Sequence, residues 1–120
     1  MKKHVIVCDD DKTILEVIKD ILEEEGYKVS LFADCKNILD LVSEHKPDLI
    51  ILDIWMPKFN GNEAVKQLKA NLFSKNIPIV LISALNEGLA ISKELRVEGY
   101  IKKPFDIDDL LTTVKKSLHD

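Results

Sequence analysis

Short apolar runs alternate along the chain with longer segments in which apolar residues recur every three or four positions. The runs are residues 4–8 (HVIVC), 28–32 (KVSLF), 49–53 (LIILD), 77–83 (IPIVLIS) and 99–102 (GYIK). Most of them are nearly continuous rather than alternating in polarity, which is typical of strands buried on both faces of a parallel sheet. The pattern therefore predicts five parallel strands.

Helical periodicity fills the segments between these runs. The apolar positions of the first predicted helix are Ile14, Val17, Ile18, Ile21 and Leu22. Those of the second are Ile38, Leu41 and Val42, and those of the third are Ala64, Val65, Leu68 and Leu72. Gly26 is expected to end the first helix, and Asp34 is expected to cap the second.

The last two helices differ in how clearly they are signalled. The final helix has Asp106 at its N-cap and Asp109 three residues on, with Phe105 placed to pack on Leu110. Its apolar face continues through Ile107, Leu111, Val114 and Leu118. The fourth helix, within residues 86–95, contains Gly88 and has a poor pattern, so we expect it to be short or mobile.

This βαβαβαβαβα order accounts for the whole chain as one domain, residues 1–120. Right-handed crossovers then give a doubly wound α/β fold with helices on both faces of the sheet. In such folds ligands bind beyond the carboxyl ends of the strands, where the strand order reverses. For a five-stranded sheet ordered 2-1-3-4-5, that point lies between the first and third strands.

The polar residues at that edge suggest a specific chemistry. The first predicted strand ends in Asp9, Asp10 and Asp11, the third in Asp53, the fourth in Ser83 and the fifth in Lys103. Clustered carboxylates without a histidine or thiol form a hard oxygen site suited to Mg²⁺. A carboxylate can also act as a nucleophile that forms an acyl phosphate, and a lysine and a hydroxyl would stabilise the added phosphoryl oxygens.

Each of these features also has a simpler interpretation. Three aspartates before a helix often serve only as cap and dipole compensation, and a single aspartate after a strand, such as Asp53, is usually a turn residue. Ser83 alone carries no signal, and the KPF sequence that begins at Lys103 is an ordinary loop. Only their joint placement on one sheet edge favours a functional site.

Composition narrows the class of protein. The chain has a net charge of -4 and one arginine, Arg96, so we expect no direct binding to nucleic acid. No stretch approaches the roughly 18 apolar residues of a membrane span, and the N-terminus does not resemble a signal peptide, so we expect a cytoplasmic protein with no membrane contact. Two cysteines are too few for a disulfide scaffold or a zinc site, and Cys8 is expected to be a buried thiol.

Four sequence segments together resemble the receiver domain of bacterial two-component response regulators, of the single-domain chemotaxis-regulator (CheY-like) type. VIVCDDD resembles the acidic pair after the first strand, and LIILDIWMPKFNG resembles the phosphoacceptor segment with its Met-Pro pair and glycine. IVLISA resembles the fourth strand with its hydroxyl residue, and GYIKKPF resembles the fifth strand with its aromatic residue and Lys-Pro. The resemblance covers essentially the whole chain and implies the (βα)5 flavodoxin-like fold.

The resemblance also implies roles for residues of the site. Asp53 would be the phosphorylated aspartate. Mg²⁺ would be held by Asp10, Asp53 and the backbone carbonyl of Trp55, while Asp9 would act mostly through metal-bound water and pair with Lys103. Asp11 is left outside the site, as a cap or a first-turn acid of the first helix.

Three further positions complete the implied machinery. Ser83 would hydrogen-bond a phosphoryl oxygen, and Lys103 would pair with Asp53 and then with its phosphate. Tyr100 would be the switch aromatic, turning inward as Ser83 moves toward the phosphate. The Lys103–Pro104 bond is expected to be cis.

The family's signalling chemistry implies the partners. A sensor histidine kinase or a histidine phosphotransfer protein would donate the phosphoryl group. The phosphorylated state would change a surface made of the fourth helix, fifth strand and fifth helix, which would control a downstream target or form a homodimer. The protein would not be a conventional enzyme, although it would catalyse its own phosphorylation and dephosphorylation.

Departures from the family pattern concern the flanks of the site. The stretch from Ser83 to Lys103 is about two residues shorter than is common in the family, which affects the expected shape of the fourth helix. Trp55 and Leu85 are apolar where they flank the site. Either Trp55 contributes only its carbonyl and Leu85 packs locally, or the two side chains shield the acyl phosphate from water and make it long-lived.

Other functions fit the sequence less well. An aspartate-nucleophile phosphatase would use the Asp9–Asp11 spacing but leaves the segment around Asp53 without a role. A flavin carrier would need a phosphate-cradling loop after the first strand, where this chain is acidic. A pseudo-receiver that binds without being phosphorylated usually lacks a site residue, and the motifs of nucleotide binders are absent from the sequence.

Overall fold

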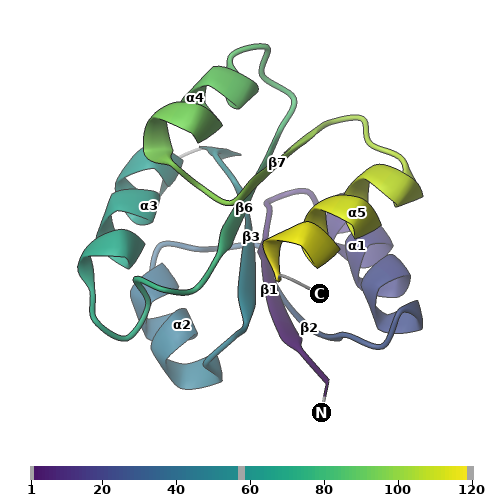
Figure 1. Ribbon diagram of the computed structural model, residues 1–120, viewed down its shortest axis with the longest axis horizontal. Helices are drawn as coiled ribbons and strands as arrows, with labels where there is room; N and C mark the ends of the chain where they lie inside the picture. Colours follow the sequence, from purple (N-terminus) through teal and green to yellow (C-terminus); the bar gives the residue numbers. More distant parts are fainter. Residues whose placement is uncertain (1, 57–58, 119–120) are drawn as a thin grey trace.

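The core of the molecule is a parallel sheet whose strands follow the predicted order. In the computed structural model, which describes residues 2–56 and 59–118, these strands are β1 (His4–Cys8), β2 (Lys28–Phe32), β3 (Leu49–Asp53), β6 (Ile79–Ser83) and β7 (Gly99–Lys102). They pair in the order β2-β1-β3-β6-β7 (Figure 1). This is the 2-1-3-4-5 arrangement, so the predicted doubly wound α/β fold is confirmed.

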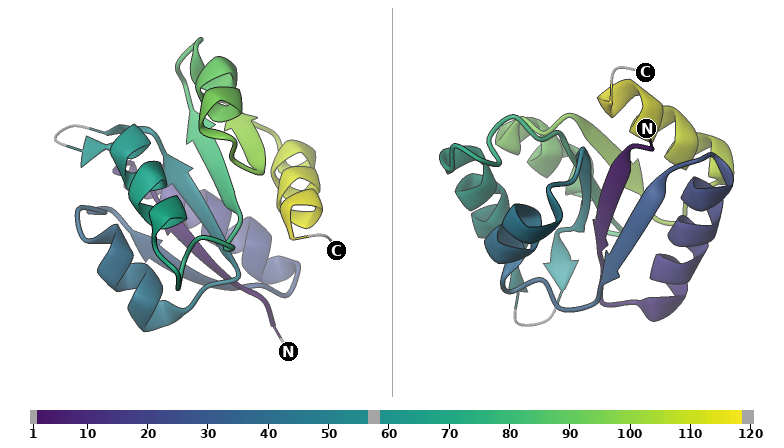
Figure 2. Two further views of the ribbon diagram at one scale, coloured as in Figure 1. Left: turned by 60° about the vertical axis from the view of Figure 1, so that its left-hand side comes forward. Right: turned by 90° about the horizontal axis from the view of Figure 1, so that it is seen from below.

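Helices cover both faces of the sheet (Figure 2). The helices α1 (Lys12–Glu24) and α5 (Ile107–Ser117) pack on one face, and α2 (Ile38–His45), α3 (Gly61–Ala70) and α4 (Gly88–Leu95) pack on the other. Every residue of β1, β3 and β6 is buried. Burial on both faces explains why these strands read as continuous apolar runs in the sequence.

Two helix starts behave as their sequences predict. The carboxylate of Asp11 accepts hydrogen bonds from the backbone N–H groups of Thr13 at 2.9 Å and Ile14 at 3.3 Å, so it caps α1. Asp106 caps α5 by accepting from the N–H of Asp109 at 2.8 Å. Gly26 follows α1 with a φ of +94°, a left-handed conformation that glycine adopts without a steric penalty.

Several predicted details are wrong. Asp34 does not cap α2, which begins after Asn37. The Asp34 carboxylate instead closes a turn by accepting from the N–H of Lys36 at 3.1 Å. Leu72 is not part of α3, because the backbone turns extended at Asn71, and Leu72 is 84% exposed. Val17 and Ile107 lie on helices as expected, but their side chains are exposed rather than on the apolar face.

Strand limits also differ from the sequence pattern. The fourth long strand begins at Ile79 rather than at residue 77. A short antiparallel pair, β4 (Trp55–Met56) with β5 (Phe59–Asn60), follows Asp53 and was not predicted, because strands of two residues leave no periodic signal. Pro57, the second residue of the Met-Pro pair, lies outside the described residues.

Two further expectations are met. The helix α4 is only eight residues long, in agreement with its weak pattern. Cys8 and Cys35 are both buried free thiols.

Within residues 2–56 and 59–118, no helix has the length and hydropathy needed to cross a lipid bilayer.

Candidate functional site

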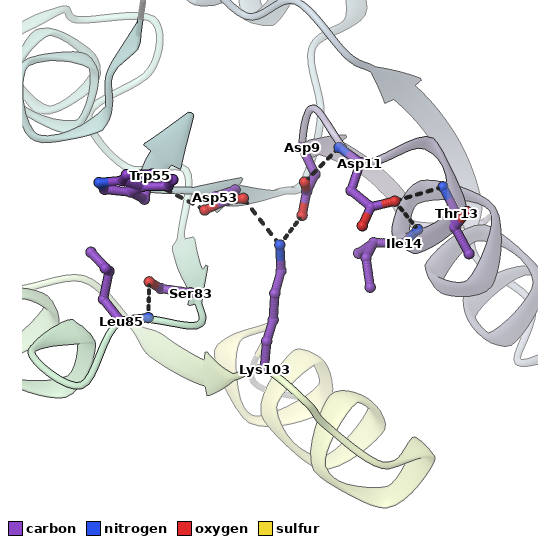
Figure 3. A network of polar contacts seen from close by, with 9 residues as sticks. All are labelled: Asp9, Asp11, Thr13, Ile14, Asp53, Trp55, Ser83, Leu85 and Lys103. Atoms are coloured by element: carbon purple, nitrogen blue, oxygen red, sulfur yellow. Dashed lines mark hydrogen bonds and ion pairs between the residues drawn. The ribbon is translucent and has the colours of Figure 1, made fainter. Parts of the chain in front are cut away.

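A lysine and two aspartates from three different strands meet at the carboxyl edge of the sheet. The ammonium of Lys103 lies 2.7 Å from Oδ2 of Asp9 and 3.0 Å from Oδ2 of Asp53 (Figure 3). Asp9 follows β1, Asp53 ends β3, and Lys103 follows β7. The predicted convergence is confirmed, as are the predicted pairings of Lys103 with Asp53 and with Asp9.

The backbone around Lys103 fixes where its side chain starts. Its N–H donates to the carbonyl of Ser83 at 2.9 Å, which extends the pairing of β7 with β6 by one residue. The following Lys103–Pro104 peptide bond is cis, as predicted. Lys103 therefore reaches across the end of β6, from the edge strand β7, to the two aspartates.

Each buried aspartate is also held by an amide two residues further on. Oδ1 of Asp9 accepts from the N–H of Asp11 at 2.9 Å, and Oδ1 of Asp53 accepts from the N–H of Trp55 at 3.0 Å. Each carboxylate thus gives one oxygen to its own loop and the other to Lys103. These amide contacts were not predicted, although an aspartate that ends a strand commonly accepts from the backbone two residues on.

Three carboxylates form a candidate cation site. Oxygens of Asp9, Asp10 and Asp53 all lie within 4.8 Å of one another, with Asp9 and Asp53 buried and Asp10 exposed. Within the described part of the chain, the Lys103 ammonium is the sole partner of Asp9 Oδ2. Three negative charges faced by one ammonium leave an excess of negative charge, and an all-oxygen donor set of this kind fits Mg²⁺.

Burial and charge change the acidity of the site. Burial raises the pKa of Asp53 above its ordinary value of 3.8, while the Trp55 N–H and the Lys103 ammonium act in the opposite direction. For Lys103, burial alone would lower the pKa, but the bonds to Asp9 and Asp53 outweigh it, and the pKa is raised. Lys103 therefore remains a cation at neutral pH, between two carboxylates.

Ser83 lies at the same edge but has a different partner. It is buried, and it directly follows Ile82, the residue that pairs with Asp53 between β6 and β3. Its Oγ accepts from the N–H of Leu85 at 2.9 Å (Figure 3). The hydroxyl is therefore bonded to its own loop, within the site that holds Asp53.

Tyr100 links β7 to the start of α4. It pairs with Leu81 of β6 and is partly exposed, and burial raises the pKa of its phenol. Its ring lies against Gly88, where an added Cβ would approach the Tyr100 Cε1 to 2.6 Å. Any change in the position of this ring therefore affects the first turn of α4.

An open groove borders the phosphoacceptor candidate. Its volume is about 520 Å³, and the side chains that line it include Trp55, Phe59, Leu85 and Ile91. Trp55 is 66% exposed. Trp55 and Leu85 both stand beside Asp53 and Ser83 (Figure 3).

Comparison with known proteins gives one consistent family. The sequence model of the family described as "response regulator receiver domain" matches residues 5–115. Sporulation initiation phosphotransferase F of Bacillus subtilis (strain 168) is 33% identical over 120 residues, a match that covers 98% of this chain and 95% of that protein.

Solved structures agree with the sequence comparison. The chemotaxis response regulator CheY4 of Vibrio cholerae has a TM-score of 0.88 and 28% identity, covering 98% of this chain and 99% of that one. A CheY-like response regulator receiver domain protein from Methanospirillum hungatei JF-1 has a TM-score of 0.88 and 27% identity, covering 99% of this chain and 95% of that one.

Proposed function

Because the chain belongs to the response regulator receiver domain family, a family of two-component signalling modules rather than conventional enzymes, we propose that it is phosphorylated on Asp53. The observation that carries this proposal is the Lys103 ammonium held between Asp9 and Asp53 beside a third carboxylate, Asp10. This arrangement provides a nucleophilic carboxylate together with a fixed cation for the incoming phosphoryl group.

The phosphoryl donor is a phosphohistidine on a sensor histidine kinase or a phosphotransfer protein. A carboxylate oxygen of Asp53 attacks the phosphorus, and the P–N bond of the donor breaks. The electron pair of that bond stays on the imidazole nitrogen, which takes up a proton. Lys103 then pairs with the phosphoryl oxygens, and the Ser83 hydroxyl donates a hydrogen bond to one of them.

Asp10, Asp53 and the backbone carbonyl of Trp55 are the groups that would hold Mg²⁺, with Asp9 acting through a metal-bound water. When bound, the cation neutralises the negative charge that builds up on the transferring phosphoryl group. The mutual proximity of the three carboxylates supports this assignment, because they repel one another without a counter-charge.

The output surface consists of α4, β7 and α5. Tyr100 connects this surface to the site, because its ring contacts Gly88 at the start of α4. Leu89 on α4 is 50% exposed, which supports contact with a downstream target or a second copy of the chain. The name of the Bacillus relative, a phosphotransferase, supports a place in a relay that passes the phosphoryl group on.

The rival phosphatase assignment finds less support in the same contacts. It would need Asp9 and Asp11 as a working pair, but Asp11 caps α1 and Asp9 pairs with Lys103. A pseudo-receiver assignment is likewise weakened, because each residue expected of a phosphorylated receiver is present in the chain.

Incubation with acetyl phosphate and Mg²⁺, followed by intact mass spectrometry, tests the proposal. The wild-type chain is expected to gain one phosphoryl group, and Asp53→Ala is expected to gain none. Asp34→Ala, which removes an exposed aspartate outside the acidic cluster, should behave as wild type. Turnover of phosphate esters without a stable adduct on Asp53 would instead identify a phosphatase, and an unchanged mass would identify a pseudo-receiver.

A further inference from the structure

The connection between α3 and β6 holds two large apolar side chains in solvent. Leu72 is 84% exposed and Phe73 is 51% exposed. The segment is nevertheless fixed by internal hydrogen bonds: the buried hydroxyl of Ser74 donates to the Leu68 carbonyl at 2.6 Å, and the N–H of Lys75 donates to the Asn71 carbonyl at 2.8 Å. An ordered turn therefore presents these side chains outward, and their exposure is not the result of fraying.

An apolar groove lies directly beside this turn. It has a volume of about 360 Å³ and is formed between the end of α2 and the α3–β6 connection. Its lining residues are Val42, Ser43, Lys46, Pro47, Phe73 and Ile77. A groove of this size accommodates one or two large apolar side chains, and a rim of exposed apolar residues is typical of protein-binding surfaces.

The charged side chain that lines the groove is a lysine, although the chain as a whole is acidic. Lys46 lines the groove, and Lys75 is exposed between Phe73 and Ile77 in the sequence. Glu44 lies near Lys46 in the sequence but is not among the residues that line the groove, and residues 71–78, which form the other wall, include no acidic residue. This local charge is complementary to a partner that carries carboxylates next to its apolar contacts.

The groove is far from the phosphorylation site. Pro47 and Ile77 precede β3 and β6, whereas Asp53 and Ser83 end the same strands. Five residues of strand at about 3.3 Å each separate the two ends by roughly 15 Å. In Figure 1 the two connections that form the groove lie at the lower left, at the end of the sheet opposite the β4–β5 pair. Phosphorylation of Asp53 therefore has no direct contact through which to alter the groove.

We propose that this groove docks an acidic amphipathic segment of a partner protein, whether or not Asp53 is phosphorylated. A large apolar side chain of the partner fills the groove beside Phe73, Leu72 covers its edge, and carboxylates of the partner pair with Lys46 and Lys75. A concave apolar pocket favours an inserted side chain over a lipid surface, which would cover Leu72 but leave the groove unfilled. The proposal does not depend on the function proposed for Asp53.

Two labelled helical peptides provide the probe. Both carry the same leucine and phenylalanine face, and their polar faces carry glutamate in one peptide and lysine in the other. Fluorescence anisotropy with the full chain should show that the glutamate peptide binds at least about tenfold more tightly than the lysine peptide. The affinity for the glutamate peptide should fall about tenfold in each of three variants, which are Leu72→Ser, Phe73→Ser and the double variant Lys46→Glu/Lys75→Glu.

Control variants and a second ligand make the result decisive. Val17→Ser, which alters an exposed valine on the other face of the molecule, should bind the glutamate peptide as wild type does. Beryllofluoride with Mg²⁺ should change the affinity of the wild-type chain by less than about threefold. An unchanged far-ultraviolet circular dichroism spectrum and urea unfolding midpoint show that each variant is folded, and neither measurement requires Asp53 to be phosphorylated.

Several outcomes contradict the proposal. Equal affinity of wild type and both apolar variants, or equal affinity for the two peptides, would show that the groove is not the docking site. Stronger binding to anionic phosphatidylglycerol vesicles than to the glutamate peptide would assign the surface to lipid. Self-association of the wild type that is lost in Phe73→Ser would assign it to a second copy of the chain.

Discussion

Asp9, Asp10 and Asp11 are consecutive in the sequence, but their carboxylates face different surroundings. Asp9 is buried and pairs with Lys103, Asp10 is exposed beside Asp9 and Asp53, and Asp11 binds the first amides of α1. Because successive residues at the end of a strand point in different directions, a run of like charges need not repel as one cluster. The three residues are therefore expected to respond differently to substitution.

Substitution of Asp10 and of Asp11 should separate cation binding from helix capping. Asp10→Ala is expected to weaken Mg²⁺ binding at least about tenfold, since the proposed function makes Asp10 a direct ligand. Asp11→Ala should leave Mg²⁺ affinity within about twofold but lower the free energy of unfolding by about 1 kcal/mol, because α1 loses its cap. Titration of Trp55 fluorescence with Mg²⁺ and unfolding in urea measure the two effects. If both variants lose Mg²⁺ affinity equally, the assignment of Asp10 is wrong.

Replacement of Asp53 by asparagine should stabilise the fold at neutral pH in the absence of Mg²⁺. Asp53 faces two carboxylates and one ammonium. Two like charges 4 Å apart repel by about 1 kcal/mol even in bulk water, so the free energy of unfolding is expected to rise by about 1 kcal/mol. Urea unfolding monitored by circular dichroism measures it.

The pH dependence of this gain follows from the raised pKa. Burial raises the pKa of Asp53, so the folded protein binds a proton at this carboxyl more tightly than the unfolded chain does. The carboxyl's contribution to stability is therefore lost as the pH rises through the folded-state value. The advantage of Asp53→Asn should shrink as the pH falls toward 3.8, the ordinary value. A gain that stays constant over this pH range would show that the carboxylate's charge is not its cause.

At the scale of elements, α4 and β7 are coupled through one close contact. Gly88 is the first residue of α4, and a Cβ at this position would collide with the ring of Tyr100. Alanine is otherwise favoured over glycine within helices by about 1 kcal/mol. Whether a substitution at Gly88 raises or lowers the free energy of unfolding therefore depends on whether the Tyr100 ring is present.

A double-mutant cycle tests this coupling. Gly88→Ala is expected to destabilise the wild-type chain, because the added methyl group displaces the Tyr100 ring. In a Tyr100→Ala background the same change should be neutral or stabilising, with a coupling energy of at least about 0.5 kcal/mol. Urea unfolding of the four proteins gives the energies, and additive effects would show that the contact does not couple the elements.

The loops that follow β3 and β6 form the walls around Asp53. Trp55, in the short strand β4, and Leu85, in the loop after β6, line the same groove. If these side chains shield an acyl phosphate from water, then Trp55→Asn/Leu85→Glu should hydrolyse phospho-Asp53 several times faster than the wild type. Decay of the phosphorylated species by intact mass spectrometry gives both rates. Equal rates would mean that Trp55 serves only through its backbone and that Leu85 packs locally.

At the scale of the whole molecule, the fold could be predicted because its strands are buried on both faces. Runs such as residues 49–53 differ in period from the helices between them, and the carboxyl ends of parallel strands necessarily share one edge. The meeting of Asp9, Asp53 and Lys103 follows from that geometry.

Other features could not be read from the sequence for physical reasons. The β4–β5 pair is too short to show a period, and the exposure of Leu72 and Ile107 depends on where neighbouring elements end. The Trp55 and Leu85 N–H groups that hold Asp53 and Ser83 belong to the backbone, so the side chains at positions 55 and 85 do not reveal them. The sequence thus predicts which side chains meet, while the structure supplies the contacts that orient them.

The proposed function requires that Asp53, rather than another aspartate of the cluster, carries the phosphoryl group. Borohydride reduction converts an aspartyl phosphate to homoserine, so peptide mass spectrometry after acetyl phosphate and Mg²⁺ treatment locates the modified residue. Homoserine is expected at position 53 alone. Homoserine at position 9 or 10, or no homoserine in a chain that has gained phosphate, would contradict it.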